Sequence, residues 1–363
     1  TKSAVSRAKN GDTEMSEVIL EVKHLCTSFL SESSEMRAVD DMSYTVKRGE
    51  CVAIIGESGS GKSVSALSIL KLIPYPPGVI KQGEVIFKGR DLMKLSNAEL
   101  EDIRGNEISM IFQDPLGTLN PTMPIGQQIM EVLFKHQQMT RQEAKQRTLE
   151  MLTMVGIEEP EARFDLQPHF FSGGMRQRCV IAAALAANPR LLFADEATTA
   201  LDVTIQAKIL ELIKRIQAER GISVIYITHD LGVVAKVADY VNVMYAGKIV
   251  EVGNVNEIFY DPKHPYTWGL LSAMPDLETD DDRLYSIPGS PPNLLHEPKG
   301  DAFAPRNTFA LAIDEKADPP LFKISDTHYA ATWLLHPDAP EFEMPPELVA
   351  RLERARKEAE KYL

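Results

Sequence analysis

The sequence is poor in cysteine. Its 363 residues include three, Cys26, Cys51 and Cys179, which lie far apart in apolar stretches. This spacing indicates neither a disulfide framework nor a pair of metal ligands. We therefore expect small buried thiols in a reducing cytoplasm.

Long apolar runs and excess positive charge are also missing. No uninterrupted apolar run approaches the roughly 20 residues that cross a bilayer, and no basic start leads into an apolar signal core. These absences predict a chain that is neither a membrane protein itself nor exported. The net charge of −13 argues against a protein whose main task is to hold nucleic acid. The composition, 44% hydrophobic and 25% charged, is that of an ordinary globular chain, and 363 residues are enough for one large domain plus a smaller one.

A glycine-rich stretch organises the chain. Residues 56–63 fit the pattern of Gly, four residues, then Gly-Lys-Ser, between an expected buried strand at 51–55 and an apolar-faced helix at 64–72. In such a loop consecutive N–H groups point at phosphate oxygens, with the positive end of the helix dipole behind them. Lys62 would bind the β and γ phosphates and Ser63 would ligate Mg²⁺. The predicted nucleotide-binding residues here are Gly56, Glu57, Ser58, Gly59, Ser60, Gly61, Lys62, Ser63 and Val64.

Strands are expected on both sides of this loop. Residues 18–25 and 42–46 alternate as β-strands do. Phe29, between them, is able to stack on an adenine ring or to serve as an ordinary core or surface aromatic. A later strand at 108–112 ends at Gln113, whose amide oxygen suits Mg²⁺ or an attacking water.

Helical periodicity follows from Pro124 to about Pro168. Thr140 and Glu143 form a capping box for a helix that Gly156 ends. We expect a helical insertion between the phosphate loop and the next strand.

A second anion site is indicated at residues 171–178. The segment Ser-Gly-Gly opens an apolar helix, where bare N–H groups and the lack of bulky side chains let phosphate come close. The sequence therefore predicts two phosphate-binding helix ends in one chain. The predicted contact residues are Ser172, Gly173, Gly174, Met175 and Gln177.

A third pattern is an apolar strand at 191–196 that ends in two acids. Asp195 suits Mg²⁺, and Glu196 suits a water that must be oriented or deprotonated. Two acidic residues at a strand end are also found simply as solvent-exposed charges. Here the phosphate loop upstream favours a catalytic role for them. Asp202 follows in the same segment.

Another buried strand, at 224–227, leads to His229. A histidine at a strand end is often structural, but here it is able to sense a γ-phosphate and hold the attacking water. Strands that alternate with helices around a phosphate loop predict an α/β fold with a mostly parallel core sheet.

Together these motifs, over about residues 18–255, resemble an ATP-binding cassette ATPase. The resemblance implies a P-loop cassette with an N-terminal antiparallel β part, working as a head-to-tail pair. Each ATP would lie between one chain's phosphate loop and the other chain's Ser-Gly-Gly helix. The resemblance implies that Lys62 binds phosphate and that Ser63, Gln113 and Asp195 bind Mg²⁺. It also implies that Glu196 is the general base and His229 the switch. Asp202 would lie in the loop at the dimer interface.

The resemblance narrows to the oligopeptide and dipeptide importers. Residues 110–115, 119–121 and 171–178 look like that branch, and 264–267 with 287–292 look like its C-terminal extension. Nickel importers share these features. The methionine of the Ser-Gly-Gly-Met run looks like the D type of two paired ATPase subunits, which implies a related but non-identical ATPase partner.

Two departures from that branch stand out. Ala197 replaces the usual proline after the two acids, and both carboxylates are kept. Many members of the branch bind an iron–sulfur cluster through cysteines in the extension, but Asp301, Asn307 and Asp314 stand where those cysteines would be. Because such clusters need thiolate ligands, no iron–sulfur cluster is expected.

The predicted organisation has three parts. Residues 1–16 are expected to be a disordered extension or an artificial leader, 17–255 the cassette with a helical subdomain at about 115–175, and 256–363 the extension. A charged helix closes the chain from Pro346, either packed on a partner ATPase or solvated.

The predicted function is ATP hydrolysis, with ATP and Mg²⁺, at the cytoplasmic face of a cell membrane, driving peptide import. The expected partners are a second cassette ATPase, two integral membrane permease subunits and, indirectly, an extracellular peptide-binding protein, but no nucleic acid. The alternatives are an ATPase of a nickel or other small-solute importer, or a soluble cassette ATPase acting on nucleic acid or ribosomes.

Overall fold

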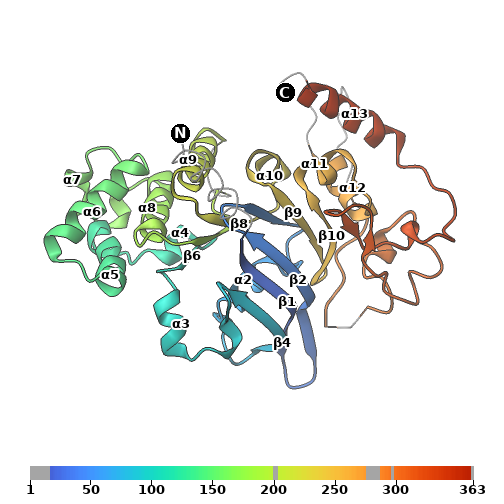
Figure 1. The fold of residues 1–363 in the computed structure, drawn as a ribbon, viewed down its shortest axis with the longest axis horizontal. Coiled ribbons are helices and arrows are strands. Elements are labelled where there is room, and N and C mark those ends of the chain that lie inside the picture. Colours follow the sequence, from blue (N-terminus) through green and yellow to red (C-terminus); the bar gives the residue numbers. More distant parts are fainter. Residues whose placement is uncertain (1–16, 199–202, 275–286, 296–297, 361–363) are drawn as a thin grey trace, which may run out of the picture. The chain divides into compact units, whose positions relative to one another are not determined.

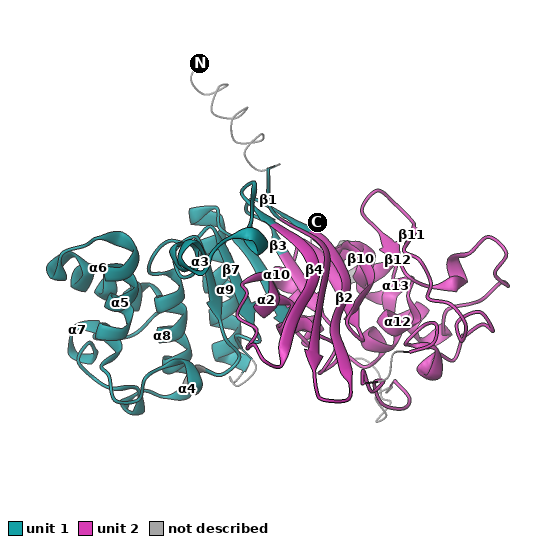
Figure 2. Cartoon of the chain, turned by 90° about the horizontal axis from the view of Figure 1, so that it is seen from below, with its two compact units in different colours: residues 1–20, 45–51, 86–227 teal, residues 21–44, 52–85, 228–363 magenta. Residues whose placement is uncertain are grey.

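The computed structural model (Figure 1) describes residues 17–198, 203–274, 287–295 and 298–360. The expectations for residues 1–16 and for Asp202 lie outside these ranges. The chain divides into two compact units, coloured in Figure 2: unit 1 contains residues 1–20, 45–51 and 86–227, and unit 2 contains residues 21–44, 52–85 and 228–363.

Unit 1 contains three parallel strands. β7 (Leu191–Asp195) pairs with β6 (Ile108–Ile111) on one side and with β8 (Ser223–Thr228) on the other. Every residue of β7 and β8 is buried, as expected for parallel strands covered on both faces. The strands predicted at 108–112, 191–196 and 224–227 are therefore confirmed within one residue of their ends.

Helices make up most of the rest of unit 1. The predicted capping box is present at the start of α6, and Gly156, at φ +76°, follows its end. Helices α5, α6 and α8 pack against one another (Figure 1), so the helical periodicity predicted from Pro124 is confirmed. The helices of this unit are α3 (Asn97–Ile103), α4 (Pro115–Thr118), α5 (Ile125–Gln137), α6 (Arg141–Met154), α7 (Pro160–Arg163), α8 (Gly173–Leu185) and α9 (Val203–Arg220), with 3-10 turns η1 (Leu92–Lys94) and η2 (Pro168–Phe170).

An antiparallel sheet has the strand order β2-β1-β4-β5. Its first strand is longer than the predicted 18–25, because the polar residues beyond Leu25 are buried with partners: Thr27 Oγ1 donates to Ser68 Oγ at 2.8 Å. The strands are β1 (Val18–Leu30), β2 (Glu35–Lys47), β4 (Gly78–Phe87) and β5 (Arg90–Asp91).

The strand before the phosphate loop, β3 (Cys51–Ile55), belongs to unit 2 from residue 52 on, and it runs parallel to β9 (Tyr240–Tyr245). β9 is followed by antiparallel β10 (Lys248–Asn254), and β10 pairs in turn with β12. The remaining elements are α2 (Lys62–Ile69), α10 (Leu231–Val237), α11 (Val255–Tyr260), α12 (Pro265–Ser272), η3 (Ala304–Arg306), β11 (Phe322–Lys323), β12 (Tyr329–Ala330), η4 (Trp333–Leu335) and α13 (Pro346–Glu360). Parallel strands alternating with helices confirm the α/β class.

One apolar core in unit 2 joins residues on both sides of the boundary predicted at 255/256. Side chains of β3 and β9 belong to the same cluster as Tyr266, Phe303 and Leu348. Helix α13 packs on α11 and α12 (Figure 1), with Leu348 and Leu352 buried. The boundary separates the cassette motifs from the extension motifs in the sequence. It does not mark a break in packing, because β10 before it and β12 after it are hydrogen-bonded neighbours.

The three cysteines are free and buried, as predicted. Burial raises the pKa of the Cys179 thiol to about 12. No helix in the described part of the chain is both long and apolar enough to cross a membrane.

Candidate functional site

The phosphate loop runs from the end of β3 into α2, as predicted. Its two tightest positions are Gly56 and Gly61, with φ of +151° and +102°. A Cβ at Gly56 would lie 2.1 Å from the Met244 carbonyl oxygen, and one at Gly61 would lie 2.2 Å from that of Ala38. Only glycine fits such a conformation and such a close approach.

Lys62 begins α2 and is 6% exposed. Its Nζ donates to the carbonyl oxygens of Gly56 at 2.8 Å and Glu57 at 2.7 Å, and to Ser60 Oγ at 3.4 Å. The ammonium group is thus held inside the loop by the loop's own oxygens. Phosphate oxygens are stronger acceptors than carbonyls, so the same group is placed to bind them.

The other predicted loop residues differ in exposure. Ser58 and Gly59 are exposed, and Ser63 and Val64 are half-buried at the start of α2. Phe29 lies near the end of β1, half-buried, with its ring edge 3.2 Å from where a Cβ at Gly78 would be. That ring packs on the start of β4, and adenine stacking stays a prediction.

Sequence reasoning missed the contacts that hold Glu57. Its N–H donates to the Tyr266 hydroxyl at 2.7 Å, and its carboxylate accepts from Arg306 at 2.6 and 3.0 Å. These partners lie 209 and 249 residues further along the chain. No local pattern marks a contact of such sequence separation.

In unit 1 the structure brings the predicted catalytic carboxylate and amide together. Asp195 ends β7 and is 4% exposed. Glu196 follows at φ +45°, with its N–H donating to the Ile227 carbonyl at 2.8 Å. Gln113 Nε2 donates to Glu196 Oε2 at 2.7 Å. A glutamate in the left-handed region is uncommon, and such strain gathers at functional sites.

The Ser-Gly-Gly helix start is open. Ser172 is the N-cap of the 13-residue helix α8, and its Oγ accepts the Met175 N–H at 3.3 Å. Ser172 and Gly173 are exposed, and a Cβ at Gly173 would touch nothing within 4 Å. The start of α8 is therefore uncrowded, and phosphate binding to its N–H groups stays a prediction.

Gln177 corrects one expectation. It was predicted to contact ATP together with the helix start, but it is 3% exposed, and its amide donates to the Ala197 carbonyl at 2.5 Å. The reason is helical spacing, because position 177 lies more than a turn inside α8 and on its buried face. Gln177 therefore ties α8 to the segment after the two carboxylates.

His229 is exposed in unit 2. It precedes Asp230, the N-cap of α10, whose Oδ1 accepts the Val233 N–H at 3.2 Å. The cap fixes the backbone on the C-terminal side of His229.

The three positions matched to cluster cysteines are used as turn acceptors. Side-chain oxygens of Asp301, Asn307 and Asp314 accept the backbone N–H groups of residues 303, 309 and 311 at 2.9, 2.9 and 2.6 Å. Burial raises the pKa of Asp301 to about 6. The absence of a cluster stays a prediction from ligand chemistry.

Comparison with known proteins agrees with this arrangement. The ABC transporter family matches residues 39–199, and the family "Oligopeptide/dipeptide transporter, C-terminal region" matches residues 250–313. The oligopeptide transport ATP-binding protein OppD of Bacillus subtilis is 58% identical over 337 residues, covering 93% of this chain and 94% of that protein. The dipeptide transport ATP-binding protein DppD of Lactococcus lactis is 53% identical, covering 93% and 97%.

Among solved structures, the dimeric post-hydrolysis state of the ATP-binding cassette MJ0796, bound to ADP and Pi, is similar with a TM-score of 0.59 and 30% identity. The match covers 65% of this chain and 98% of that cassette. The predicted P-loop cassette fold is confirmed. The chain therefore belongs to the ABC transporter ATPases that carry an oligopeptide/dipeptide transporter C-terminal region.

Proposed function

We propose that this chain hydrolyses ATP to power peptide import through a membrane ABC transporter. The observation that carries the proposal is that one chain holds both the cassette match and the peptide-transporter C-terminal match. It is also 58% identical to the Bacillus subtilis OppD protein over 93% of its own length. A nickel or other small-solute importer, or a cassette ATPase acting on nucleic acid, is not favoured by these relatives.

ATP is bound first by the phosphate loop. The N–H groups of residues 58–63 surround the β-phosphate, and Lys62 exchanges its carbonyl partners for phosphate oxygens. Phe29 stacks on the adenine, supplying apolar area where the base would otherwise stay in water.

Hydrolysis then needs a water aligned with the γ-phosphate. Glu196 accepts a proton from that water as its oxygen attacks the γ-phosphorus, and the bond to the ADP oxygen breaks. Gln113 fixes the Glu196 carboxylate through the 2.7 Å hydrogen bond and so restricts where the proton goes. His229 contacts the γ-phosphate and reports whether it is present.

Mg²⁺ fits the oxygen-donor side chains proposed for it. Ser63, Gln113 and Asp195 supply a hydroxyl, an amide and a carboxylate oxygen, the donor types that Mg²⁺ prefers. The burial of Asp195, at 4% exposure, agrees with a carboxylate meant for a cation rather than for solvent. When bound, the ion would neutralise charge on the phosphates.

The working unit is proposed to be a pair of cassettes. Ser172, Gly173, Gly174 and Met175 present the open start of α8 to the ATP of a partner. The partner is a related second ATPase, docked with it on two integral membrane permease subunits at the cytoplasmic face. A peptide-binding protein acts from outside, and no nucleic acid takes part.

In this assembly residues 17–255 act as the cassette, with residues of about 115–175 as the helical subdomain that faces the permeases. Residues 256–363 form the extension.

Purification from the native membrane in mild detergent tests the proposal. We expect two membrane subunits and a second cassette ATPase to accompany the chain, and ATP hydrolysis to rise when peptide and the binding protein are added. A chain that arrives with ribosomes or DNA, or whose ATPase activity responds to nickel and not to peptides, would contradict it.

A further inference from the structure

We infer that Arg306, in the C-terminal extension, is a positioning residue that holds the phosphate loop in its ATP-binding conformation. The inference deepens the proposed ATPase function and rests on it. It makes the extension a working part of the nucleotide site in this chain.

The contact is a two-pronged ion pair. Nη1 of Arg306 donates to Glu57 Oε2 at 2.6 Å, and Nη2 donates to Oε1 at 3.0 Å. Nε donates to the Pro288 carbonyl at 2.8 Å, and Nη1 also reaches the Tyr245 hydroxyl at 3.3 Å. The guanidinium therefore uses donors on all three nitrogens, and its planar geometry fixes the carboxylate's orientation as well as its distance.

Burial makes this pair more costly to break than a surface salt bridge. The Arg306 side chain is 4% exposed and that of Glu57 is 28% exposed. The hydrogen bonds with Glu57 hold the pKa of Arg306 above its usual range despite burial. Removing one partner would leave the other charge poorly solvated, which is far more costly than losing an exposed pair.

Glu57 passes this restraint on to the phosphate-binding atoms. Its N–H is fixed by the hydroxyl of Tyr266, which also comes from the extension. Its carbonyl oxygen accepts from Lys62 Nζ at 2.7 Å and from the Ser60 N–H at 3.2 Å. A loop held at Glu57 by both side chain and backbone keeps its N–H groups aimed without further loss of entropy when phosphate binds.

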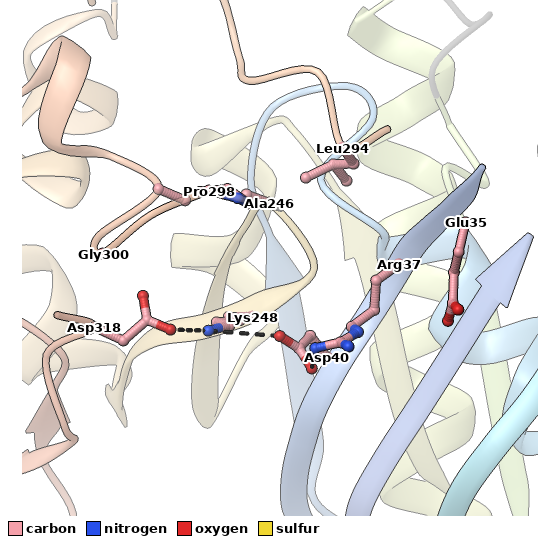
Figure 3. Close-up of a pocket in the computed structure, with 10 residues that line it drawn as sticks. Glu35, Arg37, Asp40, Ala246, Lys248, Leu294, Pro298, Gly300 and Asp318 are labelled. Atoms are coloured by element: carbon pink, nitrogen blue, oxygen red, sulfur yellow. Dashed lines mark hydrogen bonds and ion pairs between the residues drawn. The ribbon is translucent and has the colours of Figure 1, made fainter. Parts of the chain in front are cut away.

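Other contacts attach the extension to the cassette strands. In Figure 3, Lys248 of β10 lies between Asp318 of the extension and Asp40 of β2, at the wall of a cavity of about 160 Å³. Phe303 packs on Tyr245 and Tyr266 with ring centroids 5.2 and 5.3 Å away. Because these contacts do not involve Arg306, its loss should loosen the phosphate loop without detaching the extension.

The test is Arg306→Gln in the full chain, assembled with its transporter subunits. We expect the affinity for a fluorescent ATP analogue to fall by about tenfold or more, and KM for ATP to rise similarly, since hydrogen bonds to charged groups carry about that much. The kcat at saturating ATP should change by less than about twofold, because bound nucleotide restores the loop. Arg306→Lys keeps the positive charge but loses the planar, two-pronged contact with the carboxylate, and it should therefore recover part of the ATP affinity.

A matched control is available in the same extension. Arg351 of α13 donates to the carbonyls of Ser272 and Met274, away from the phosphate loop. Arg351→Gln should leave ATP affinity unchanged. Thermal unfolding of both variants separates a loss of affinity from a loss of folded protein.

The pair is tested directly by adding Glu57→Gln. If Arg306 acts through Glu57, the double variant binds ATP no more weakly than the weaker single variant. Unchanged affinity in Arg306→Gln, or additive losses in the double variant, would overturn the inference while leaving the ATPase function intact. Wild-type protein that fails to bind or hydrolyse ATP would instead refute the proposed function.

Discussion

Glu196 sits in a strained backbone conformation, with its carboxylate held by Gln113 at 2.7 Å. A side chain fixed in this way loses little freedom when a water must be aligned beside it. At the scale of single residues, this glutamate and a buried aspartate of the extension give the sharpest tests.

Glu196→Gln should keep ATP binding and lower kcat by about 100-fold or more, because the attacking water loses its general base. Turnover and ATP binding are measured in the assembled complex. Glu211→Gln, an exposed change on α9, is the control and should behave as wild type. An unchanged kcat in the first variant would refute the role of Glu196.

Asp301 predicts a change of stability with pH. Burial raises its pKa to about 6, against about 4 in an unfolded chain. Between these values the folded chain binds more protons than the unfolded chain, so this group's contribution to stability falls as the pH rises from about 4 to 6. Asp301→Asn keeps the oxygen that accepts the Phe303 N–H.

We therefore expect Asp301→Asn to raise the free energy of unfolding by about 1–3 kcal/mol above pH 6, and to have little effect near pH 4. Urea unfolding at several pH values gives the difference between variant and wild type. A difference that does not vary with pH would show that burial does not penalise the charged form.

At the scale of elements, the terminal helix α13 is the part whose role the sequence left open. Its buried leucines join the core of unit 2. Leu348→Ala should lower the free energy of unfolding by about 2–4 kcal/mol, as expected for a buried leucine. The next residue, Val349, is 38% exposed. Val349→Ala should therefore lower the free energy of unfolding by less than about 0.5 kcal/mol. Equal urea midpoints for the two variants would show that the helix is merely solvated.

At the scale of the whole molecule, metal content tests the prediction that this chain binds no iron–sulfur cluster. Protein purified without oxygen should show no visible absorption from iron–sulfur charge transfer and no stoichiometric iron, because thiolate ligands are missing where they are needed. Iron analysis alongside the spectrum checks this. One cluster's worth of iron per chain would overturn the comparison of Asp301, Asn307 and Asp314 with cysteine ligands.

Much of the fold was predictable because its signals are local. The phosphate loop, the capping box at Thr140 and the apolar strands each depend on residues within one turn or one strand. Strand ends were less predictable: β1 runs to Leu30 because buried polar side chains such as Thr27 find partners that its own sequence does not show. Helical spacing already places Gln177 on the buried face of α8, but its partner, the Ala197 carbonyl, lies in another segment that no local pattern marks.

The sequence by itself determined the chemistry of this protein. The glycines, Lys62 and the paired carboxylates specify an ATPase, because phosphate binding and water activation need those groups at those spacings. Only the tertiary structure decided that the extension reaches the nucleotide loop. Arg306 and Glu57 are 249 residues apart, and no periodicity in the sequence relates such positions. They pair because the packing of the extension brings the buried Arg306 guanidinium next to the Glu57 carboxylate.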